Sequence, residues 1–183
     1  MTDSLYRKKQ KRAALACCLM AALGLLLGPY ASGLRLEKSL EDIFYNGESG
    51  NGIGVASDLS DRADCGVNLA SVGSRYLESS LLSPLKNAAQ GLRSAGSLRE
   101  KAEANDILER EFRAVTSLLE SESLSDKDRE LVSSLVSMFD SCSYTMSHDG
   151  YNAEASGYNS AIKTFPGSLI FSLMGLETAP VFR

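Results

Sequence analysis

Three kinds of residue in this sequence have side chains suited to chemistry: a histidine, two cysteines and a repeated tyrosine-asparagine pair. His148 is the only histidine, and Asp149 follows it directly. A hydrolytic triad needs a nucleophile, a base and an orienting acid in mutual contact, and adjacency in the sequence does not provide that contact. We therefore expect His148 to lie at a helix end or on the surface. A hydrolase centred on His148 is the lowest-ranked functional hypothesis.

Cys65 and Cys142 lie outside the N-terminal apolar segment, which holds Cys17 and Cys18. One histidine and two separated cysteines do not have the spacing of metal ligands, so we expect no metal and no cofactor. The favoured interpretation of Cys65 and Cys142 is two small buried residues, because free cysteine is among the most buried residue types. A disulfide between them stays open, since it requires an oxidising compartment and helices that touch.

The Tyr-Asn pair occurs twice, beginning at Tyr151 and at Tyr158. This spacing is close to two helical turns, so both pairs fall on one side of a helix. Asparagines lie at or near apolar stripes in four places: Asn68, Asn105, Asn152 and Asn159. Buried amides are normally bonded within the protein, which favours a packing seam. The alternative function is a small-ligand sensor that uses these amides in a cavity between helices.

Helices are the elements that must position these residues. Aromatic residues make up 7% of the chain and tryptophan is absent, so the residues that favour strands are few. Apolar residues recur at helical spacing from Leu36 onward. The glycine-rich stretch 46–54 lacks the lysine and the glycine spacing of a phosphate-binding loop, and we interpret it as a connection. We expect an all-α fold, an antiparallel bundle of four to five helices.

Local signals divide the bundle into its helices. A helix is expected over Ser57–Ser80, with one bulky stripe and one stripe of small residues. Helix starts are expected at three places: Ser83 with Pro84, Ser97 with Glu100, and Ser125 with Asp128. The stripe expected on the last of these helices consists of Leu131, Leu135, Met138, Cys142 and Met146. The apolar face changes near Gly150, which predicts a new inward side or an interruption there.

The N-terminus divides into a basic tail and an uncharged segment. Five basic residues within 1–12 precede residues 13–34, which carry no charge. Basic residues remain on the cytoplasmic side of a membrane, so we expect a basic cytoplasmic tail (1–12), a transmembrane anchor or signal-like segment (13–34) and a helical bundle domain outside (35–183). The uncharged run approaches the roughly 20 residues that a bilayer requires, which favours an anchor. Whether the segment is cleaved stays open.

The predicted domain is acidic. The chain holds 19 basic and 23 acidic residues, and removing five basic residues and Asp3 of the tail leaves 14 against 22 after Gly33, a net charge of −8. An acidic domain binds nucleic acid poorly, so we expect no nucleic acid partner. Acidic helix faces could contact a basic partner, although a solvated surface explains them equally well. The residues concerned are Glu100, Glu103, Asp106, Glu109, Glu111, Glu120 and Glu122.

The ending YNAEASGYNSAIKTFPGSLIFSLMGLETAPVF resembles the C-terminal signature of LemA family proteins, in which a Tyr-Asn-rich helix leads to Phe-Pro, an apolar turn, a glycine and a closing Phe. The matching positions are Phe165, Pro166, Leu169, Ile170, Gly175, Pro180 and Phe182. The stretch DRADCGVNLASVGSRYL resembles the family's Arg-x-Asp-x-x-Pro-Asn-Leu pattern at Arg62, Asp64, Asn68 and Leu69, with Val67 where proline is common. The resemblance covers essentially the whole chain. It implies an antiparallel bundle held at a membrane, with no established enzymatic activity and no catalytic residues.

The prediction that combines these observations is a non-enzymatic, membrane-anchored bundle outside the cell membrane. It would be a single-pass protein of the cell envelope, acting as a scaffold or protein-interaction module. The tail of 12 residues is too short for a signalling domain, so any output must pass through a partner. The sequence does not identify that envelope protein, and homo-oligomerisation stays open.

Overall fold

The computed structural model describes residues 14–17, 20, 24, 31–48, 50, 52–164, 168, 171–172 and 175–182, and all regular structure within them is helical. The helices are α2 (Val55–Gly73), α3 (Ser79–Ser94), α4 (Leu98–Glu120), α5 (Asp126–His148) and α6 (Gly150–Lys163), and residues 31–46 are also helical. The predicted all-α class is therefore confirmed. The described residues belong to two compact units, Leu40–Gly157 with Ala179–Arg183, and Met1–Ser39 with Tyr158–Thr178.

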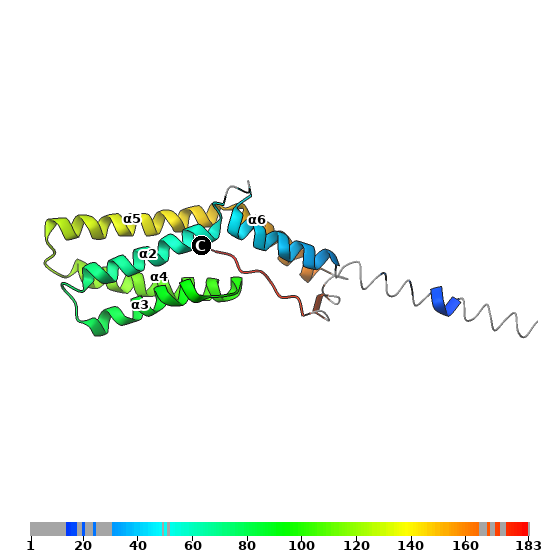
Figure 1. The fold of residues 1–183 in the computed structure, drawn as a ribbon, viewed down its shortest axis with the longest axis horizontal. Helices are drawn as coiled ribbons and strands as arrows, with labels where there is room; N and C mark the ends of the chain where they lie inside the picture. Colours follow the sequence, from blue (N-terminus) through cyan, green and yellow to red (C-terminus); the bar gives the residue numbers. More distant parts are fainter. Residues whose placement is uncertain are drawn as a thin grey trace, which may run out of the picture. The chain divides into compact units, whose positions relative to one another are not determined.

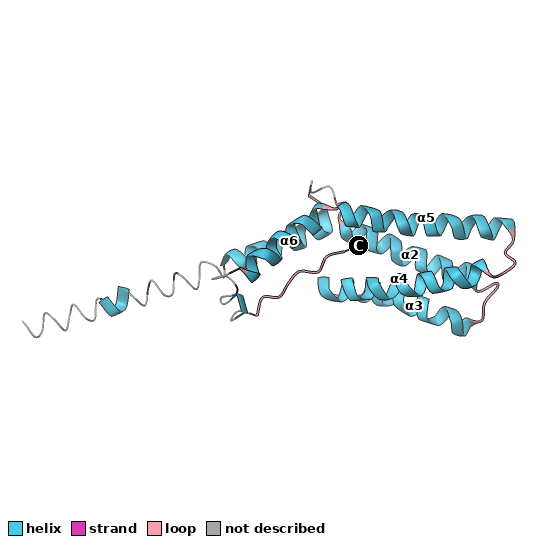
Figure 2. Ribbon diagram, turned by 180° about the vertical axis from the view of Figure 1, so that it is seen from behind, coloured by secondary structure: helices cyan, strands magenta, loops and turns pink. Residues whose placement is uncertain are grey.

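The first unit contains a bundle built from α2 to α5. Helix α2 packs against α3, α4 and α5, and α3 packs against α4. Consecutive helices of the bundle run in opposite directions, with α5 along one edge and α3 along the other (Figures 1 and 2). A helical bundle with antiparallel neighbours, as predicted, is thus present in this unit.

Helix α2 is apolar on two sides, as its sequence predicts. Its bulky stripe buries Cys65, Leu69 and Val72, and its small stripe allows neighbours to approach closely. A Cβ atom on Gly66 would lie 2.9 Å from Leu108 Cδ1 of α4. The helix ends at Gly73, earlier than the expected Ser80, because residues 74–76 form a turn in which Tyr76 N–H and Leu77 N–H both donate to the Gly73 carbonyl.

The expected start of α3 at Ser83-Pro84 is wrong. The helix begins at Ser79 and contains Pro84, so one backbone hydrogen bond of the helix is missing. The extra turn carries Leu82, which is fully buried and packs against Gly73 of α2. Burial of this leucine side chain, about 1.5–3 kcal/mol, offsets the missing bond. The two later starts are confirmed, since Ser97 and Glu100 form a capping box and Ser125 accepts from the Asp128 backbone N–H.

The expected inward stripe of α5 is partly wrong. Leu135, Cys142 and Met146 are buried, but Leu131 and Met138 are exposed. Their places in the core are taken by the next residues along the chain, Val132 and Phe139. The expected and the observed residues both have helical spacing. Which of the two sets faces the core is decided by the contact that Phe139 makes with α4. Its ring stacks on Phe112 with centroids 3.9 Å apart.

The predicted change at Gly150 is an interruption between two helices. Asp149 ends α5 in an extended conformation, and its carboxylate accepts from the Tyr151 backbone N–H at 2.8 Å, which caps α6. Tyr151 is buried between Phe44 and Phe182. The C-terminal residues 176–182 form no regular structure, yet Phe182 is buried in this cluster. The loop after residue 46 is a connection, as predicted, with Gly47 and Gly52 at positive φ.

The second unit is described more sparsely. Tyr158, Ile162 and Phe171 are buried in it, and Gly33 lies against Phe171 and Leu176. The predicted transmembrane segment, residues 13–34, falls largely outside the described residues. Within the part of the chain that the structure does describe, no helix has the length and apolar character to cross a bilayer.

Candidate functional site

The most unusual group in the bundle is a fully buried arginine, Arg62 of α2. Its guanidinium donates to Asn105 Oδ1 at 2.5 Å and forms an ion pair with Glu109, both on α4. Burial lowers the pKa of Arg62, and the neighbouring Glu109 carboxylate opposes that shift. A buried charge is tolerated only when it is paired and hydrogen-bonded, so these partners are what allow Arg62 to lie in the core.

The same guanidinium also contacts α5. The Arg62 Cζ atom lies 3.9 Å from the centroid of the Phe139 ring, a cation–π contact. Arg113 extends the network because it donates to Glu109 at 2.7 Å and forms an ion pair with Asp140. Arg62 therefore joins α2, α4 and α5. Its Nε is buried without a hydrogen-bond partner, and the rest of the group is satisfied. This arrangement holds the three helices in position against one another.

Half-buried Asp58 lies one turn before Arg62 on α2. Burial raises the pKa of Asp58 to about 6, and the charges of Asp61 and Asp149 act in the same direction. Arg62 and a hydrogen bond from the Cys142 thiol act against them. Burial likewise raises the pKa of the Cys142 thiol to about 11, so this cysteine stays protonated and is a poor nucleophile. Cys65 and Cys142 are both buried free thiols, which confirms their interpretation as small core residues.

The predicted asparagine positions separate into different roles. Asn105 is bonded to Arg62, and the Asn152 amide donates to the Met146 and Phe182 carbonyls at 2.8 and 2.7 Å. Asn152 also accepts from the Phe182 backbone N–H at 3.0 Å, so it fastens the C-terminal residues to α6. Asn68 is exposed beside buried Leu69 on α2, and Asn159 is half-buried. The amides of Asn105 and Asn152 are therefore bonded within the protein, as the packing interpretation requires.

The other residues of the family pattern are core residues, surface residues or turn residues. Leu69 is fully buried, Asp64 forms an exposed ion pair with Arg93, and Gly175 has a positive φ of 68°. Phe165 and Pro166 lie outside the described residues. Tyr151 and Tyr158 are both buried, as the packing interpretation requires.

His148 lies at a helix end and on the surface, as its sequence context predicts. It is exposed at the end of α5, with Nδ1 2.9 Å from both Ser147 Oγ and the Tyr144 carbonyl oxygen. The Asp149 carboxylate caps Tyr151 instead of orienting the imidazole. Among the residues that the structure describes, no three His, Cys, Asp or Glu side chains gather as metal ligands would.

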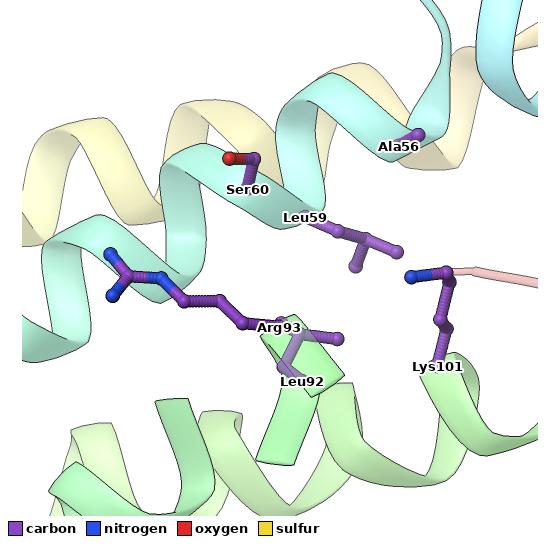
Figure 3. A pocket seen from close by; sticks show the side chains of 6 residues that line it. All are labelled: Ala56, Leu59, Ser60, Leu92, Arg93 and Lys101. Carbon is purple, nitrogen blue, oxygen red and sulfur yellow. The ribbon is translucent and has the colours of Figure 1, made fainter. Parts of the chain in front are cut away.

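A small pocket lies between α2 and the junction of α3 with α4. Its volume is about 160 Å³, and Leu59 and Leu92 line it together with the cationic side chains of Arg93 and Lys101 (Figure 3). Ser60 completes the polar part of its lining. The predicted asparagines are not among its lining residues. The pocket is large enough for a small anion and too small for a drug-sized ligand.

A feature that the sequence analysis overlooked is the exposed side of α5. We define the outer face of α5 as Leu131, Ser134, Met138, Ser141 and Thr145, which are all exposed and follow each other at spacings of three and four residues. Leu131 is 42% exposed and Met138 is 46% exposed. Tyr144, 68% exposed, flanks this face. The near-absence of charge between 131 and 147 was visible in the sequence.

Some of the acidic residues proposed for partner contact form ion pairs or hydrogen bonds within the domain. Glu109 is bonded to Arg62 and Arg113, and Glu111 pairs with Arg110. Glu100 accepts from the Gly96 and Ser97 backbone N–H groups, which lowers its pKa. The acidic surface is therefore smaller than its sequence indicates.

These residues define an all-α helical bundle with an apolar core, in which a buried arginine joins α2, α4 and α5. A comparison with models of protein families matches residues 53–183 to the LemA family. That match covers well over half of the chain, so the chain belongs to the LemA family, as the C-terminal residues indicate. No match was found among curated proteins or among solved structures.

Proposed function

We propose that this protein is a membrane-tethered interaction module without catalytic activity, and that the outer face of α5 is its docking surface. The observation that carries the proposal is a contrast in charge between two neighbouring helices. Nine charged residues fall between Arg99 and Arg113 of α4, whereas Asp140 alone falls between Leu131 and Ser147 of α5. Asp140 is itself neutralised by an ion pair with Arg113.

An exposed helix segment with a single charged residue is unusual for a surface that contacts only water. Cores of protein interfaces are depleted in charged residues and enriched in tyrosine and methionine, and Met138 and Tyr144 are both exposed on α5. Leu131 and Met138 are exposed apolar side chains about two turns apart on this face, with Ser134 between them. The serines between them remove bulk, so that a partner helix could approach closely.

The sequence of the N-terminus supports the tether. Residues 13–34 are uncharged and follow five basic residues, which is typical of an anchor whose basic side stays in the cytoplasm. The bundle would then lie outside the cell membrane and pass any output through what it binds. The buried Arg62 network keeps α5 fixed on α2 and α4, so its outer face is presented by a rigid element.

A matched pair of substitutions tests the docking role. Met138→Glu places a charge on the outer face of α5, and Ile107→Glu places one on α4 at a residue of similar exposure, 43%. After extraction of the full chain from its native membranes in a mild detergent, we expect gel filtration to show a smaller complex for Met138→Glu and no change for Ile107→Glu. An unchanged elution volume for both variants would contradict the proposal.

The pocket beside Arg93 and Lys101 favours a second candidate function, the binding of a small anion. Lys101 lines the pocket together with Arg93, which is paired with Asp64, and Ser60 contributes a hydroxyl. Calorimetric titration with inorganic phosphate should then give binding that Lys101→Ala abolishes. The exposed Lys86→Ala variant on α3 is the control and should bind as the unmodified chain does. Absence of heat with the unmodified chain would remove this candidate.

A further inference from the structure

We propose that Phe44, Tyr151 and Asn152 form a recognition site for an extended peptide in which a phenylalanine follows a proline by two positions. In this structure the site is occupied by residues 179–182 of the same chain, which we call the strap. The strap is then a built-in competitor, and the external ligand is a partner protein that presents the same kind of segment. The inference goes beyond the proposed docking role, since it uses no residue of the outer face of α5.

The strap is bound through its backbone, as an extended peptide ligand is. The Asn152 amide donates to the Phe182 carbonyl at 2.7 Å, and its Oδ1 accepts from the Phe182 backbone N–H at 3.0 Å. One side chain thus makes the pair of hydrogen bonds that a residue of a neighbouring β-strand would make. The Tyr151 hydroxyl donates to the Pro180 carbonyl at 3.1 Å. All three bonds use main-chain atoms of the strap, so another extended segment can form them equally well.

The side chains of the strap define what the site selects. Phe182 is 1% exposed, and its ring centroid lies 5.3 Å from that of Phe44 and 5.6 Å from that of Tyr151. Val181 is 43% exposed, so neighbouring residues point to opposite sides, as in a strand. Pro180 has no backbone N–H that would need a partner, and its fixed φ suits an extended segment. The site therefore requires an aromatic residue at one position and tolerates variation at the position before it.

The contacts that shape the site do not involve the strap. The Asn152 amide also donates to the Met146 carbonyl at 2.8 Å, which fixes the orientation of the amide. The Tyr151 backbone N–H donates to the Asp149 carboxylate at the start of α6, and the Tyr151 ring packs on Phe44 with centroids 5.5 Å apart. Groups that are already positioned bind a ligand at a lower entropic cost than groups that must first be ordered.

The strap is the kind of segment that opens locally. Residues 176–182 form no regular structure, and Phe182 alone among them is buried (Figure 2). Segments with few buried side chains open more readily than the helices of a core. The chain leaves the first unit after Gly157 and returns to it at Ala179, so an opened strap remains attached to the rest of the chain. It then competes with an external peptide at an effective concentration on the order of 1 mM.

Binding of a fluorescent peptide to the full chain in a mild detergent tests the inference. The probe has the sequence of residues 177–183, and fluorescence anisotropy measures its binding. Phe182→Ser removes the ring of the strap and opens the site, so we expect this variant to bind the probe with a dissociation constant of about 100 μM or lower. The unmodified chain should bind the probe about tenfold more weakly, because its strap competes for the same site.

Three control measurements separate the site from unspecific binding. Adding Asn152→Ala to the Phe182→Ser chain should abolish binding, because the bonds to the peptide backbone are lost. A probe that carries Phe182→Ser should not bind, whereas a probe that carries Val181→Ser should bind normally because that side chain points outward. Circular dichroism should show equal helix content in all the chains.

A second measurement uses only the unmodified chain, and it decides the matter alone if Phe182→Ser lowers the helix content. The probe, protected by a C-terminal amide, should at about 1 mM displace the strap from about half of the chains and so speed carboxypeptidase digestion of their C-terminal residues. The probe that carries Phe182→Ser should not speed it. The inference is overturned if a folded Phe182→Ser chain binds the probe no better than the unmodified chain, if Asn152→Ala leaves binding unchanged, or if the probe does not accelerate digestion.

Discussion

The buried pair of Arg62 and Glu109 should respond unequally to removal of its two charges. Arg62 is fully buried, whereas the Glu109 side chain is 38% exposed and has Arg113 as a second partner. In Glu109→Gln, the guanidinium stays in the core without its counter-charge, which should cost about 3 kcal/mol of unfolding free energy. In Arg62→Met, the remaining carboxylate turns to Arg113 and water. The main loss is then the unpaired Asn105 oxygen, about 1–2 kcal/mol.

Urea unfolding of the full chain in a mild detergent, followed by circular dichroism at 222 nm, measures both changes. We expect Glu109→Gln to be more destabilising than Arg62→Met by about 1–2 kcal/mol, and the double variant to match Arg62→Met alone. Glu103→Gln, at an exposed position on the same helix, is the control and should stay within about 0.5 kcal/mol. The reasoning is refuted if Arg62→Met is the more damaging of the two, or if the three single variants unfold alike.

Three further predictions concern the core of α5, the pH response and the C-terminal residues. Phe139→Ala should lower the free energy of unfolding in urea by about 3–5 kcal/mol, whereas the adjacent Met138→Ala should change it by no more than about 0.5 kcal/mol. Similar losses for the two variants would contradict the observation that Phe139 faces the core and Met138 faces outward. The folded state raises the pKa of Asp58 to about 6 from 3.8, so the charged form is disfavoured by folding and stability falls as the pH rises from about 4 to 6. Asp58→Asn should therefore stabilise the protein at pH 8, with a benefit that shrinks below pH 6 and disappears below about pH 4; a benefit that does not vary with pH would exclude this cause. Asn152→Ala removes the two hydrogen bonds to the Phe182 backbone and should lower the free energy of unfolding by about 1–3 kcal/mol. The C-terminal residues should then be digested faster by carboxypeptidase. Unchanged digestion would show that the Asn152 amide does not hold them.

Local signals in the sequence predicted much of the fold. The capping box of Ser97 and Glu100 and the cap at Ser125 depend on neighbours three residues away, so they were found correctly. The two stripes of α2 follow directly from helical periodicity. The start of α3 was predicted too late because proline is common in the first turn of a helix. The helix begins one turn earlier because Leu82 is buried against α2.

The candidate site was harder to predict from the sequence because the residues that contact one another lie far apart along the chain. Arg62 matched a family position, but its burial depends on Asn105 and Glu109 of another helix. On α5, both Met138 and Phe139 fit a helical stripe, and the choice between them is made by Phe112 and Arg62. Once Phe139 turns inward, the uncharged outer face follows, so an error of one residue in phase concealed the proposed docking surface.

Site-specific photo-crosslinking of the full chain in its native cells tests the proposed docking role most directly. A photoreactive amino acid is placed at residue 138 on the outer face of α5 or at residue 107 on α4, positions of similar exposure. Irradiation should give a discrete protein adduct from residue 138 and none above background from residue 107. Equal labelling at both positions, or no adduct at residue 138, would contradict the assignment of this face as the docking surface.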